Sequence, residues 1–322
     1  MVRKLAAAIL FAAAMLPATS FAQDFPNRLV RIVVPYPAGG GVDGMARSLG
    51  EGLSQIWNQP VIVENKPGAS TMIGGEFVAR APADGYTLLL TSDSSITSNP
   101  FLFPNAKFDP VKDFAPITQL IELNQLVVLH PSVPANSLKE LVALSKEKKG
   151  TLNYGSYGVG SQPHLLFEML RAQSGAEILQ IPYRGIAPAI TATLAGDVQM
   201  TLGGWSVTAG HIKAGKLKAI AISKRERQKE LPDVPTLREA GFPEIDPQSW
   251  FGLFAPAGTP RPVIDRIQKD VATVFADPRF QQKLTALAFT AAISAPDDFA
   301  KFIADDLAYK RKLIAVTGIK AE

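Results

Sequence analysis

Three glycines near the start of the chain have the spacing of a phosphate-binding loop. In the stretch "RIVVPYPAGGGVDGMARSLGEGL", Gly39, Gly41 and Gly44 satisfy G-x-G-x-x-G and lie between an apolar run and a helical pattern. Glu64 ends the next apolar run, where a dinucleotide-binding fold places the acidic residue that binds a ribose hydroxyl. The spacing therefore suggests either a nucleotide site or a site for some other anion.

The residues before the first glycine argue against a nucleotide. Pro35 and Pro37 stand between the apolar run and Gly39, whereas the nucleotide motif needs the strand to pass directly into its first glycine. Two alternatives remain open. One is a structural tight turn, and the other is a small-anion site, because glycines before a helix expose N–H groups at the positive end of its dipole. Asp43 leaves a further choice, since its carboxylate either accepts hydrogen bonds from these amides or faces the ligand.

Two later loops repeat this pattern of small and polar residues before a helix. The stretch "LNYGSYGVGSQPHLLFEML" carries Ser156 and Ser161 among glycines, and "IPYRGIAPAITATLAGDVQM" carries Tyr183, Arg184 and Gly185. Each would present hydroxyls and amides at a helix N-terminus. Arg184 is the loop cation, and a solvated surface arginine is its alternative role. Three such loops in one chain indicate binding more strongly than a single loop does.

Residues suited to catalysis or metal binding are sparse. The histidines His130, His164 and His211 lack metal-ligand spacing, and His164 is expected to be a hydrogen-bonded polar group on its helix. The G-x-S-x-G elbow of hydrolases does not occur. Acidic pairs such as Asp305 and Asp306 fall in a helix predicted to lie at the surface. Because no nucleophile has a base beside it, the sequence predicts binding without chemistry, with no metal and no cofactor.

Short runs rich in valine, isoleucine and leucine alternate with helical patterns along most of the chain. This rhythm is typical of an α/β protein with largely parallel sheets. Strands are predicted at residues 29–34, 61–64, 86–91, 117–120, 127–130, 153–156, 178–182, 198–202, 217–223 and 249–255. Helices are predicted at residues 42–56, 137–146, 162–173, 187–194, 261–275 and 296–317, with Ser137 as the N-cap of the second.

Two apolar stretches that run into proline-rich segments divide the chain. They are "FAPITQLIELNQLVVLHPSVP" and "PQSWFGLFAPAGTPRP", and the block between them has its own α/β rhythm. We therefore predict a discontinuous first domain, residues 23–122 plus 252–322, with residues 123–251 inserted as a second domain. A cleft between two such domains is where a small ligand would bind.

The N-terminal residues predict an exported protein. Arg3 and Lys4 precede an apolar run and then small residues, which is the pattern of a signal peptide (residues 1–22) cleaved near Ala22. Its removal lowers the formal net charge from +4 to +2, which gives no reason to expect a nucleic acid partner. The sequence has no cysteine, so disulfide bonds, thiolate metal sites and a cysteine nucleophile are excluded.

The three loops and several longer segments together resemble the Bug-type extracytoplasmic receptors of the tripartite tricarboxylate transporter family. The similar segments span essentially the whole mature chain and include "RIVVPYPAGGGVDGMAR", "PVIVENKPGASTMIGGEFVARAPADGYTLLL", "LNYGSYGVGSQPHL", "IPYRGIAPAI", "IKAGKLKAIAIS" and "LPDVPTLREAGFP". The resemblance implies an α/β, two-domain periplasmic-binding-protein (flytrap) fold with a ligand cleft between the domains. It also implies a periplasmic receptor that closes on a small organic carboxylate and presents it to a membrane transporter subunit or a sensor kinase.

The resemblance further implies a set of ligand contacts. In the family, a carboxylate is held mostly by backbone amides, hydroxyls and ordered water. The implied first-domain contacts are Tyr36, Ala38, Gly39, Gly40, Val42, Asp43, Ser92 and Ser94. The implied second-domain contacts are Ser156, Gly160, Ser161, His164, Tyr183, Arg184 and Gly185.

Two departures from the family pattern bear on the ligand. Residues 192–194 read Ala-Thr-Leu where the family often has Asp-Leu-Leu, and residues 94–100 read "SSITSNP" where it often has "THAINP". We therefore expect a plain mono- or dicarboxylate rather than an α-amino acid, with Tyr157 and Trp205 lining an apolar or aromatic end. We also expect a monomer. The alternative function is a secreted enzyme that acts on a nucleotide or ester through the glycine-rich loops.

Overall fold

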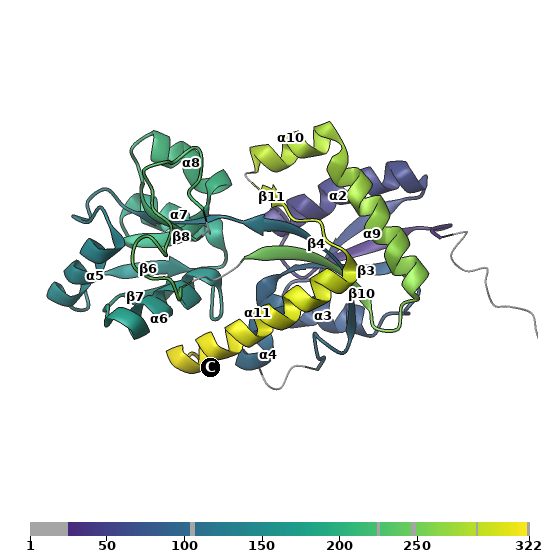
Figure 1. Cartoon of the computed structure of the whole chain (residues 1–322), viewed down its shortest axis with the longest axis horizontal. Helices are drawn as coiled ribbons and strands as arrows, with labels where there is room; N and C mark the ends of the chain where they lie inside the picture. Colours follow the sequence, from purple (N-terminus) through teal and green to yellow (C-terminus); the bar gives the residue numbers. More distant parts are fainter. Residues whose placement is uncertain (1–24, 104–106, 224–225, 246–248, 288, 321–322) are drawn as a thin grey trace, which may run out of the picture.

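The structure is a computed structural model that describes residues 25–103, 107–223, 226–245, 249–287 and 289–320. The predicted signal peptide, residues 1–22, lies outside the described residues. Within them, the chain forms two α/β lobes that lie side by side, each built on one sheet (Figure 1). None of the helices in these ranges is both long and apolar enough to cross a membrane.

The first lobe is built on a six-stranded sheet with the order β11-β4-β10-β3-β1-β2. Its strands are β1 (Val30–Val34), β2 (Val61–Asn65), β3 (Thr87–Ser92), β4 (Phe114–Leu123), β10 (Trp250–Pro256) and β11 (Phe289–Ala291). The helices around it are α2 (Gly41–Trp57), η1 (Ala69–Thr71), α3 (Met72–Ala79), η2 (Ser94–Ser98), α4 (Asn99–Leu102), α9 (Arg261–Ala276), α10 (Pro278–Ala286) and α11 (Pro296–Thr317).

The second lobe is built on a five-stranded sheet with the order β7-β6-β8-β5-β9. Its strands are β5 (Gln125–Leu129), β6 (Asn153–Ser156), β7 (Leu179–Pro182), β8 (Met200–Gly204) and β9 (Lys218–Ser223). Its helices are α5 (Leu138–Glu147), α6 (Gln162–Ser174), α7 (Ile186–Ala195) and α8 (Trp205–Lys213). Ser137 caps α5 as predicted, because its hydroxyl accepts the Glu140 N–H.

Every strand and helix predicted from the sequence overlaps an observed one, but the expectation of largely parallel sheets is wrong. β1 is parallel to β2 and β3, and β6 is parallel to β7 and β8. β10 is antiparallel to β3 and β4, and β5 is antiparallel to β8 and β9. The reason is that β4 leads the chain into the second lobe and β10 brings it back, so these neighbouring strands run in opposite directions (Figure 1).

Apolar side chains from helices cover both faces of each sheet. In the first lobe, α2, α9 and α10 pack on one face and α3 and α11 on the other. In the second lobe, α5 and α6 cover one face, while α7 and α8 cover the other. Both sheets therefore have buried central strands, and function must reside at their edges or ends.

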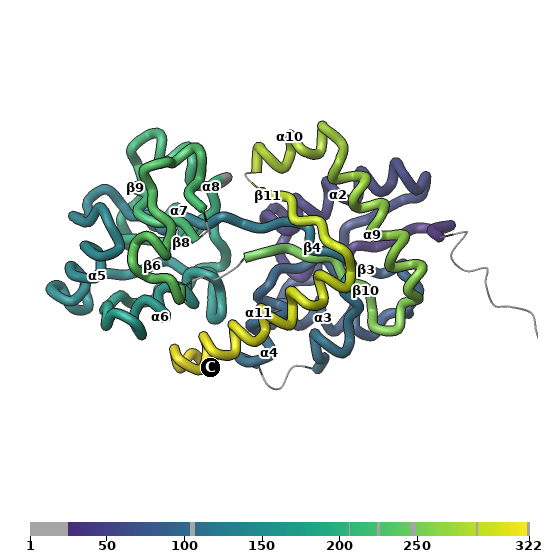
Figure 2. The backbone as a smooth tube through the Cα atoms, viewed as in Figure 1, coloured from purple at the N-terminus to yellow at the C-terminus, as the bar shows by residue number. Residues whose placement is uncertain are grey.

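Helix α11 packs on both lobes. Near its start, Phe299 and Ile303 belong to a first-lobe core cluster, and near its end Leu313 and Ile314 belong to the main second-lobe cluster. In Figure 2 the yellow tube runs from the first lobe to a position beside α6. The lobes are thus joined by this helix as well as by the strands that cross between them.

Each lobe contains the same arrangement of three parallel strands. In the first lobe, β2 lies on one side of β1 and β3 on the other; in the second lobe, β7 and β8 flank β6 in the same way. In open α/β sheets, ligands bind at the carboxyl ends of the strands where the strand order reverses, here between β1 and β3 and between β6 and β8. The topology thus selects two crevices, one in each lobe.

Candidate functional site

The crevice of the first lobe is closed by side-chain hydroxyls. The Tyr36 hydroxyl, which follows β1, lies 2.7 Å from the Ser92 hydroxyl at the end of β3 and 3.1 Å from that of Ser95. Burial raises the pKa of Tyr36, against the opposing effect of these hydrogen bonds, so the phenol is neutral and able to donate. Two predicted contacts, Tyr36 and Ser92, are therefore brought together, and Ser95 is a neighbour that the sequence analysis missed.

The glycine-rich loop after β1 leads into α2 without a side-chain cap. Gly40 is the N-cap residue, no side chain bonds to the first amides of α2, and Ala38, Gly39 and Gly40 are exposed. The first N–H groups of a helix have no partner within the helix. The loop therefore offers backbone donors to a ligand, as the small-anion alternative requires.

Asp43 supports this loop from inside the first lobe. Its Oδ2 accepts the Gly39 N–H at 2.9 Å, its Oδ1 accepts Asn65 Nδ2 at 2.9 Å, and Arg47 bonds to both oxygens at 3.0 Å. Burial opposes ionisation of Asp43, but these hydrogen bonds outweigh it and lower the pKa of Asp43. Of the two roles left open by the sequence, the geometry favours the structural one.

The loop after β6 has the same character in the second lobe. Ser156 is fully buried at the end of β6, and its Oγ accepts Gln180 Nε2 at 2.7 Å. The hydroxyl of Ser161, the N-cap residue of α6, donates to the Gly158 carbonyl at 2.6 Å instead of capping the helix. The backbone N–H of Gln162, the first residue of α6, bonds to the Tyr157 side chain. Helix α6 therefore begins at the end of a switch-point strand without a cap from Ser161, and its first amide is bonded to the loop before it.

His164 holds this second loop in place. Its Nδ1 accepts the Gly160 N–H at 3.1 Å, and burial lowers its pKa. The ring is therefore neutral, with its proton on Nε2. This confirms the expectation that His164 is a hydrogen-bonded polar group on its helix.

The third loop follows β7. The Tyr183 N–H donates to the Ser156 carbonyl at 2.8 Å, which ties this loop to the one after β6. Gly185 is the N-cap residue of α7, again without a side-chain cap. Arg184 is exposed, and no hydrogen bond or ion pair is recorded for its side chain within the described ranges. Trp205 begins α8 after β8 and packs partly buried against the cluster around Leu126.

The two carboxyl edges face each other, and the lobes are in contact. Gln162, the first residue of α6, donates through Nε2 to Asp93 Oδ2, directly after β3 in the first lobe. A Cβ atom added to Gly160 would lie 2.2 Å from Leu102 Cδ1 of α4. Burial raises the pKa of Tyr157, and the nearby Asp93 charge raises it further. The loop after β6 therefore reaches the first lobe, and the structure is closed at this point.

The predicted contacts fall into three groups. Tyr36 and Ser92 form one bonded pair, and the loop from Ser156 to Ser161 forms a second group with His164 and Tyr183. Gly39, Gly40, Val42 and Asp43 form the third group, the loop that leads into α2. In the described part of the chain, no side-chain hydrogen bond links any of these groups to the five remaining predicted contacts: Ala38, Ser94, Arg184, Gly185 and Trp205.

The acidic pair at residues 305–306 requires a correction. Asp306 is buried rather than at the surface, and its Oδ2 accepts Thr97 Oγ1 at 2.7 Å and Trp250 Nε1 at 3.0 Å. One turn later, Lys310 is fully buried and pairs with Asp93. The periodicity of the helix places both residues on one face, but only the partners distant in sequence show that this face is buried.

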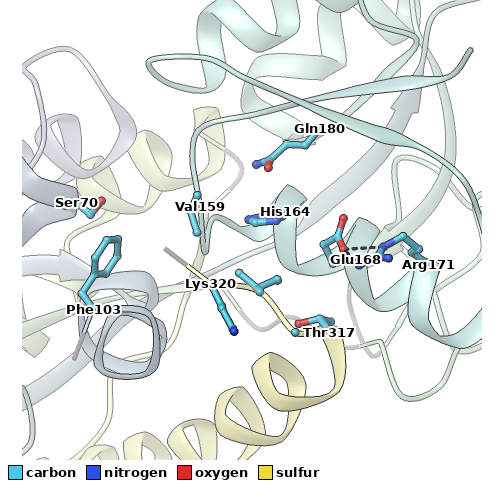
Figure 3. Close-up of a pocket in the computed structure, with 11 residues that line it drawn as sticks. Ser70, Phe103, Val159, His164, Glu168, Arg171, Gln180, Thr317 and Lys320 are labelled. Carbon is cyan, nitrogen blue, oxygen red and sulfur yellow. Dashed lines mark hydrogen bonds and ion pairs between the residues drawn. The ribbon is translucent and has the colours of Figure 1, made fainter. Parts of the chain in front are cut away.

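A cavity of about 480 Å³ lies beside these loops (Figure 3). It is lined by Ser70 and Phe103 from the first lobe, by His164 and its neighbours on α6, and by residues 317–320 at the C-terminal end of α11. Of the predicted ligand contacts, only His164 lines it. Among the described residues, no three or more His, Asp or Glu side chains are grouped so that they could hold a metal ion.

Comparison with known proteins gives consistent matches over most of the chain. The family model described as "Tripartite tricarboxylate transporter family receptor" matches residues 45–319. Protein BugT of Bordetella pertussis is 34% identical over 313 residues, which cover 97% of this chain and 96% of that protein.

Two of the similar solved structures are complexes with a dicarboxylate. An R. palustris protein with adipate has a TM-score of 0.85 at 29% identity, covering 92% of this chain and 99% of that one. MatC from Rhodopseudomonas palustris with bound malate has a TM-score of 0.81 at 29% identity, covering 90% of this chain and 100% of that one.

Proposed function

Because this chain belongs to the tripartite tricarboxylate transporter receptor family, we propose that it binds a small organic carboxylate between its two lobes. The family consists of solute-binding receptors with the two-lobed periplasmic-binding-protein fold, and the chain is a receptor rather than an enzyme. The alternative of a secreted enzyme acting on a nucleotide or ester finds no support in these comparisons.

The observation that carries the proposal is the set of uncapped helix N-termini at the facing carboxyl edges. Helix α2 begins in the first lobe, and α6 and α7 begin in the second, each without a capping hydrogen bond from the side chain of its N-cap residue. Backbone N–H groups at such ends, together with the helix dipole, favour a bound anion. Hydroxyls stand beside them at Tyr36, Ser92 and Ser156.

The free energy needed for tight ligand binding requires both lobes to contact the ligand. One helix terminus contributes about 0.3 to 1 kcal/mol to an anion and up to roughly 2 kcal/mol when partly buried. Micromolar affinity needs about 8 kcal/mol. Closure removes water from the site, so that each hydrogen bond to the ligand is stronger than in an open cleft. We therefore propose that neither lobe binds the ligand tightly alone.

The ligand contacts are assigned from amides that have no partner in the described residues and from hydroxyls at the same edge of the sheet. We assign direct contact to the amides of Gly40 and Val42 and to the hydroxyls of Tyr36 and Ser92, whereas the Gly39 amide already donates to Asp43. In the second lobe, we assign contact to the loop that carries Ser156, Gly160 and Ser161, and to Arg184 and Gly185. Asp43 and His164 are then positioning residues, because each is bonded to the loop it supports.

We propose a dicarboxylate in the size range of malate to adipate. The malate and adipate in the two solved neighbours are both dicarboxylates. With uncapped helix ends in both lobes, each carboxylate group of such a ligand could be held by a different lobe. This arrangement would also make closure depend on the ligand, because a monocarboxylate would engage only one side.

The cellular setting belongs to the same proposal. We propose that residues 1–22 are removed on export, that the receptor works as a monomer in the periplasm, and that its partner is a membrane transporter or a sensor kinase. The proposed domain boundaries, after residue 122 and before residue 252, lie close to the ends of β4 and the start of β10, where the chain crosses between lobes.

A ligand screen tests the proposal. Purified residues 23–322 would be unfolded and refolded to remove any co-purified ligand, and thermal unfolding would be followed with mono-, di- and tricarboxylates. We expect at least one dicarboxylate to raise the melting temperature in a concentration-dependent way. Calorimetric titration would then give its affinity. A screen in which every carboxylate leaves the melting temperature unchanged would contradict the proposal.

A further inference from the structure

Asp93 is the point at which three separated parts of the chain meet inside the protein. It follows β3, and its Oδ2 lies 3.1 Å from Nζ of Lys310 on α11 and accepts Nε2 of Gln162 on α6. The side chains of Asp93 and Lys310 are 1% and 0% exposed. A charged pair this deeply buried is unusual, because its desolvation is costly unless every partner is well placed.

Two of these partners belong to the first lobe. The backbone N–H of Trp250 on β10 bonds to the carboxylate of Asp93, in addition to the Lys310 ammonium. One turn before Lys310, Asp306 is bonded to Thr97 and to the Trp250 ring, which fixes this part of α11 to the first lobe. The position of Asp93 is therefore set by first-lobe contacts.

Gln162 is the partner from the other lobe. It is the first residue of α6 and directly follows Ser161, so its side chain and the amides proposed to hold a carboxylate belong to the same helical turn. Gln162 is 1% exposed, so the contact is made without intervening solvent. A rotation that separates the lobes at this edge would break the Gln162–Asp93 hydrogen bond and leave the Asp93–Lys310 pair in the first lobe.

We propose that the hydrogen bond from Gln162 to Asp93 is a latch that stabilises the closed state, with Gln162 as a positioning residue for ligand binding. The proposal rests on the proposed function, because it assigns the latch to closure around a ligand. A hydrogen bond to a charged acceptor is stronger than one between neutral groups. Its loss would favour the open state and speed ligand release without removing any ligand contact.

The charge balance around Asp93 suggests a sharp test. The groups that face it are the ammonium of Lys310, the carboxylate of Asp306, and the hydroxyls of Tyr36 and Tyr157. Gln162→Glu would place a second carboxylate against Asp93 with the same shape. At pH 8 both would be ionised and repel each other, whereas at pH 5 a shared proton would restore a hydrogen bond between them.

Two measurements distinguish the effect of the latch on closure from its effect on ligand binding. Because the chain has no cysteine, Val207→Cys on α8 and Gln282→Cys on α10 allow specific labelling of one exposed site in each lobe. Helices α8 and α10 both lie in the upper part of Figure 1. Energy transfer between the dyes reports closure without any ligand. The dissociation rate of adipate or malate, measured by stopped flow, reports closure around a ligand. Gln173→Glu, an exposed change on the same helix, is the matched control.

We expect Gln162→Glu to shift the dye pair toward the open state at pH 8 and to release the probe ligand about tenfold faster or more, with both effects reversed toward pH 5. Gln162→Met, which lacks the donor, should open the protein at both pH values. Gln173→Glu should match the parent in energy transfer and in ligand release rate at both pH values. A latch role is overturned if Gln162→Glu and Gln162→Met match the parent in energy transfer at pH 5 and pH 8. If the parent binds no carboxylate in the ligand screen, the proposed function fails, while the ligand-free measurement still decides on the latch.

Discussion

Gly160 of the second lobe lies directly against Leu102 of the first, so closely that a Cβ at position 160 would fall 2.2 Å from Leu102 Cδ1. Gly160→Ala should therefore hold the lobes apart and weaken ligand binding about tenfold or more, since overpacking a tight contact costs about 1 to 3 kcal/mol. Calorimetric titration with adipate or malate measures the effect, and small-angle scattering measures the opening.

The matched control for this change is Gly158→Ala in the same loop. Gly158 also has a positive φ, 115° against 73° for Gly160, but a Cβ there would meet nothing within 4 Å. Both variants carry backbone strain, and only Gly160→Ala carries the clash. Equal affinities for the two variants would show that the lobes do not need this close approach. Adding Leu102→Ala to Gly160→Ala should restore part of the lost affinity.

Tyr36→Phe tests the hydroxyl cluster of the first lobe. Removing the phenol hydroxyl takes one donor from the proposed site, so we expect the affinity for the ligand to fall about three- to tenfold. Tyr86→Phe is the control, because the Tyr86 hydroxyl bonds to Asn27 away from the loops. Both variants should lose similar stability in urea unfolding. If the affinity falls as much for Tyr86→Phe as for Tyr36→Phe, the result gives no support for a ligand contact by the Tyr36 hydroxyl.

Asp43→Ala tests the support of the glycine-rich loop. The variant loses bonds to Gly39, Asn65 and Arg47, and we expect the free energy of unfolding at pH 7 to fall by about 2 kcal/mol. Because folding lowers the pKa of Asp43 below 3.8, its stabilisation is complete above that pH and is lost as the pH falls through the folded value. The difference between parent and variant should therefore shrink on acidification below pH 4.

The control for Asp43 is an acid paired at the surface. Asp265 forms an i,i+4 pair with Arg261, but its side chain is 52% exposed. Asp265→Ala should change the free energy of unfolding by less than about 0.5 kcal/mol, because exposed pairs contribute little. A loss for Asp43→Ala no larger than that would show that the buried network does not stabilise the loop.

Lys310→Met tests the buried charge pair. It removes the ammonium and leaves the Asp93 carboxylate buried without its ion-pair partner, so we expect a loss of about 3 to 5 kcal/mol in urea unfolding. The double variant Lys310→Met, Asp93→Asn removes both charges and should recover part of this loss. If the double variant is no more stable than Lys310→Met alone, the penalty does not come from the uncompensated charge.

Arg184→Gln tests the exposed cation beside α7. We expect a two- to fivefold loss of affinity, about what one exposed charge contributes, and a weaker dependence of the association rate on salt. Arg238→Gln, another exposed arginine in the second lobe, is the control and should leave both unchanged. If Arg184→Gln and Arg238→Gln have the same affinity and the same salt dependence, Arg184 is a solvated surface arginine and not a ligand contact.

Local patterns in the sequence were enough for most of the secondary structure. Helix α11 was predicted at its observed ends because the proline at its start, the acids in its first turn and the basic residues near its end are all local signals. Strand β11 was missed, since it has three residues and no alternation long enough to detect. The antiparallel strands were missed for another reason: strand direction is set by how the chain crosses between lobes, which no short segment encodes.

The candidate site was likewise predictable from the sequence only in part. The loops around Gly39 and Ser156 can be recognised in the sequence, because glycines and serines precede a helix in each. In the structure, both loops lie at the carboxyl ends of switch-point strands. The ligand contacts themselves stay a prediction. Asp93 lies between Ser92 and Ser94, two of the predicted contacts, but nothing in the local sequence distinguishes it. Its importance comes from Lys310, more than two hundred positions later, and no local pattern could have linked the two.

The spacing of these partners along the chain also bears on how the protein folds. Thr97 and Asp306 are 209 positions apart, and Asp93 and Lys310 are 217 apart. The second sheet, in contrast, is complete within residues 125–223. Contacts between residues close in sequence form faster, because less chain entropy is lost in making them. The sheet of the second lobe should therefore form before α11 has packed against the first lobe. Docking of α11 would then be the late folding step that completes the cores of both lobes.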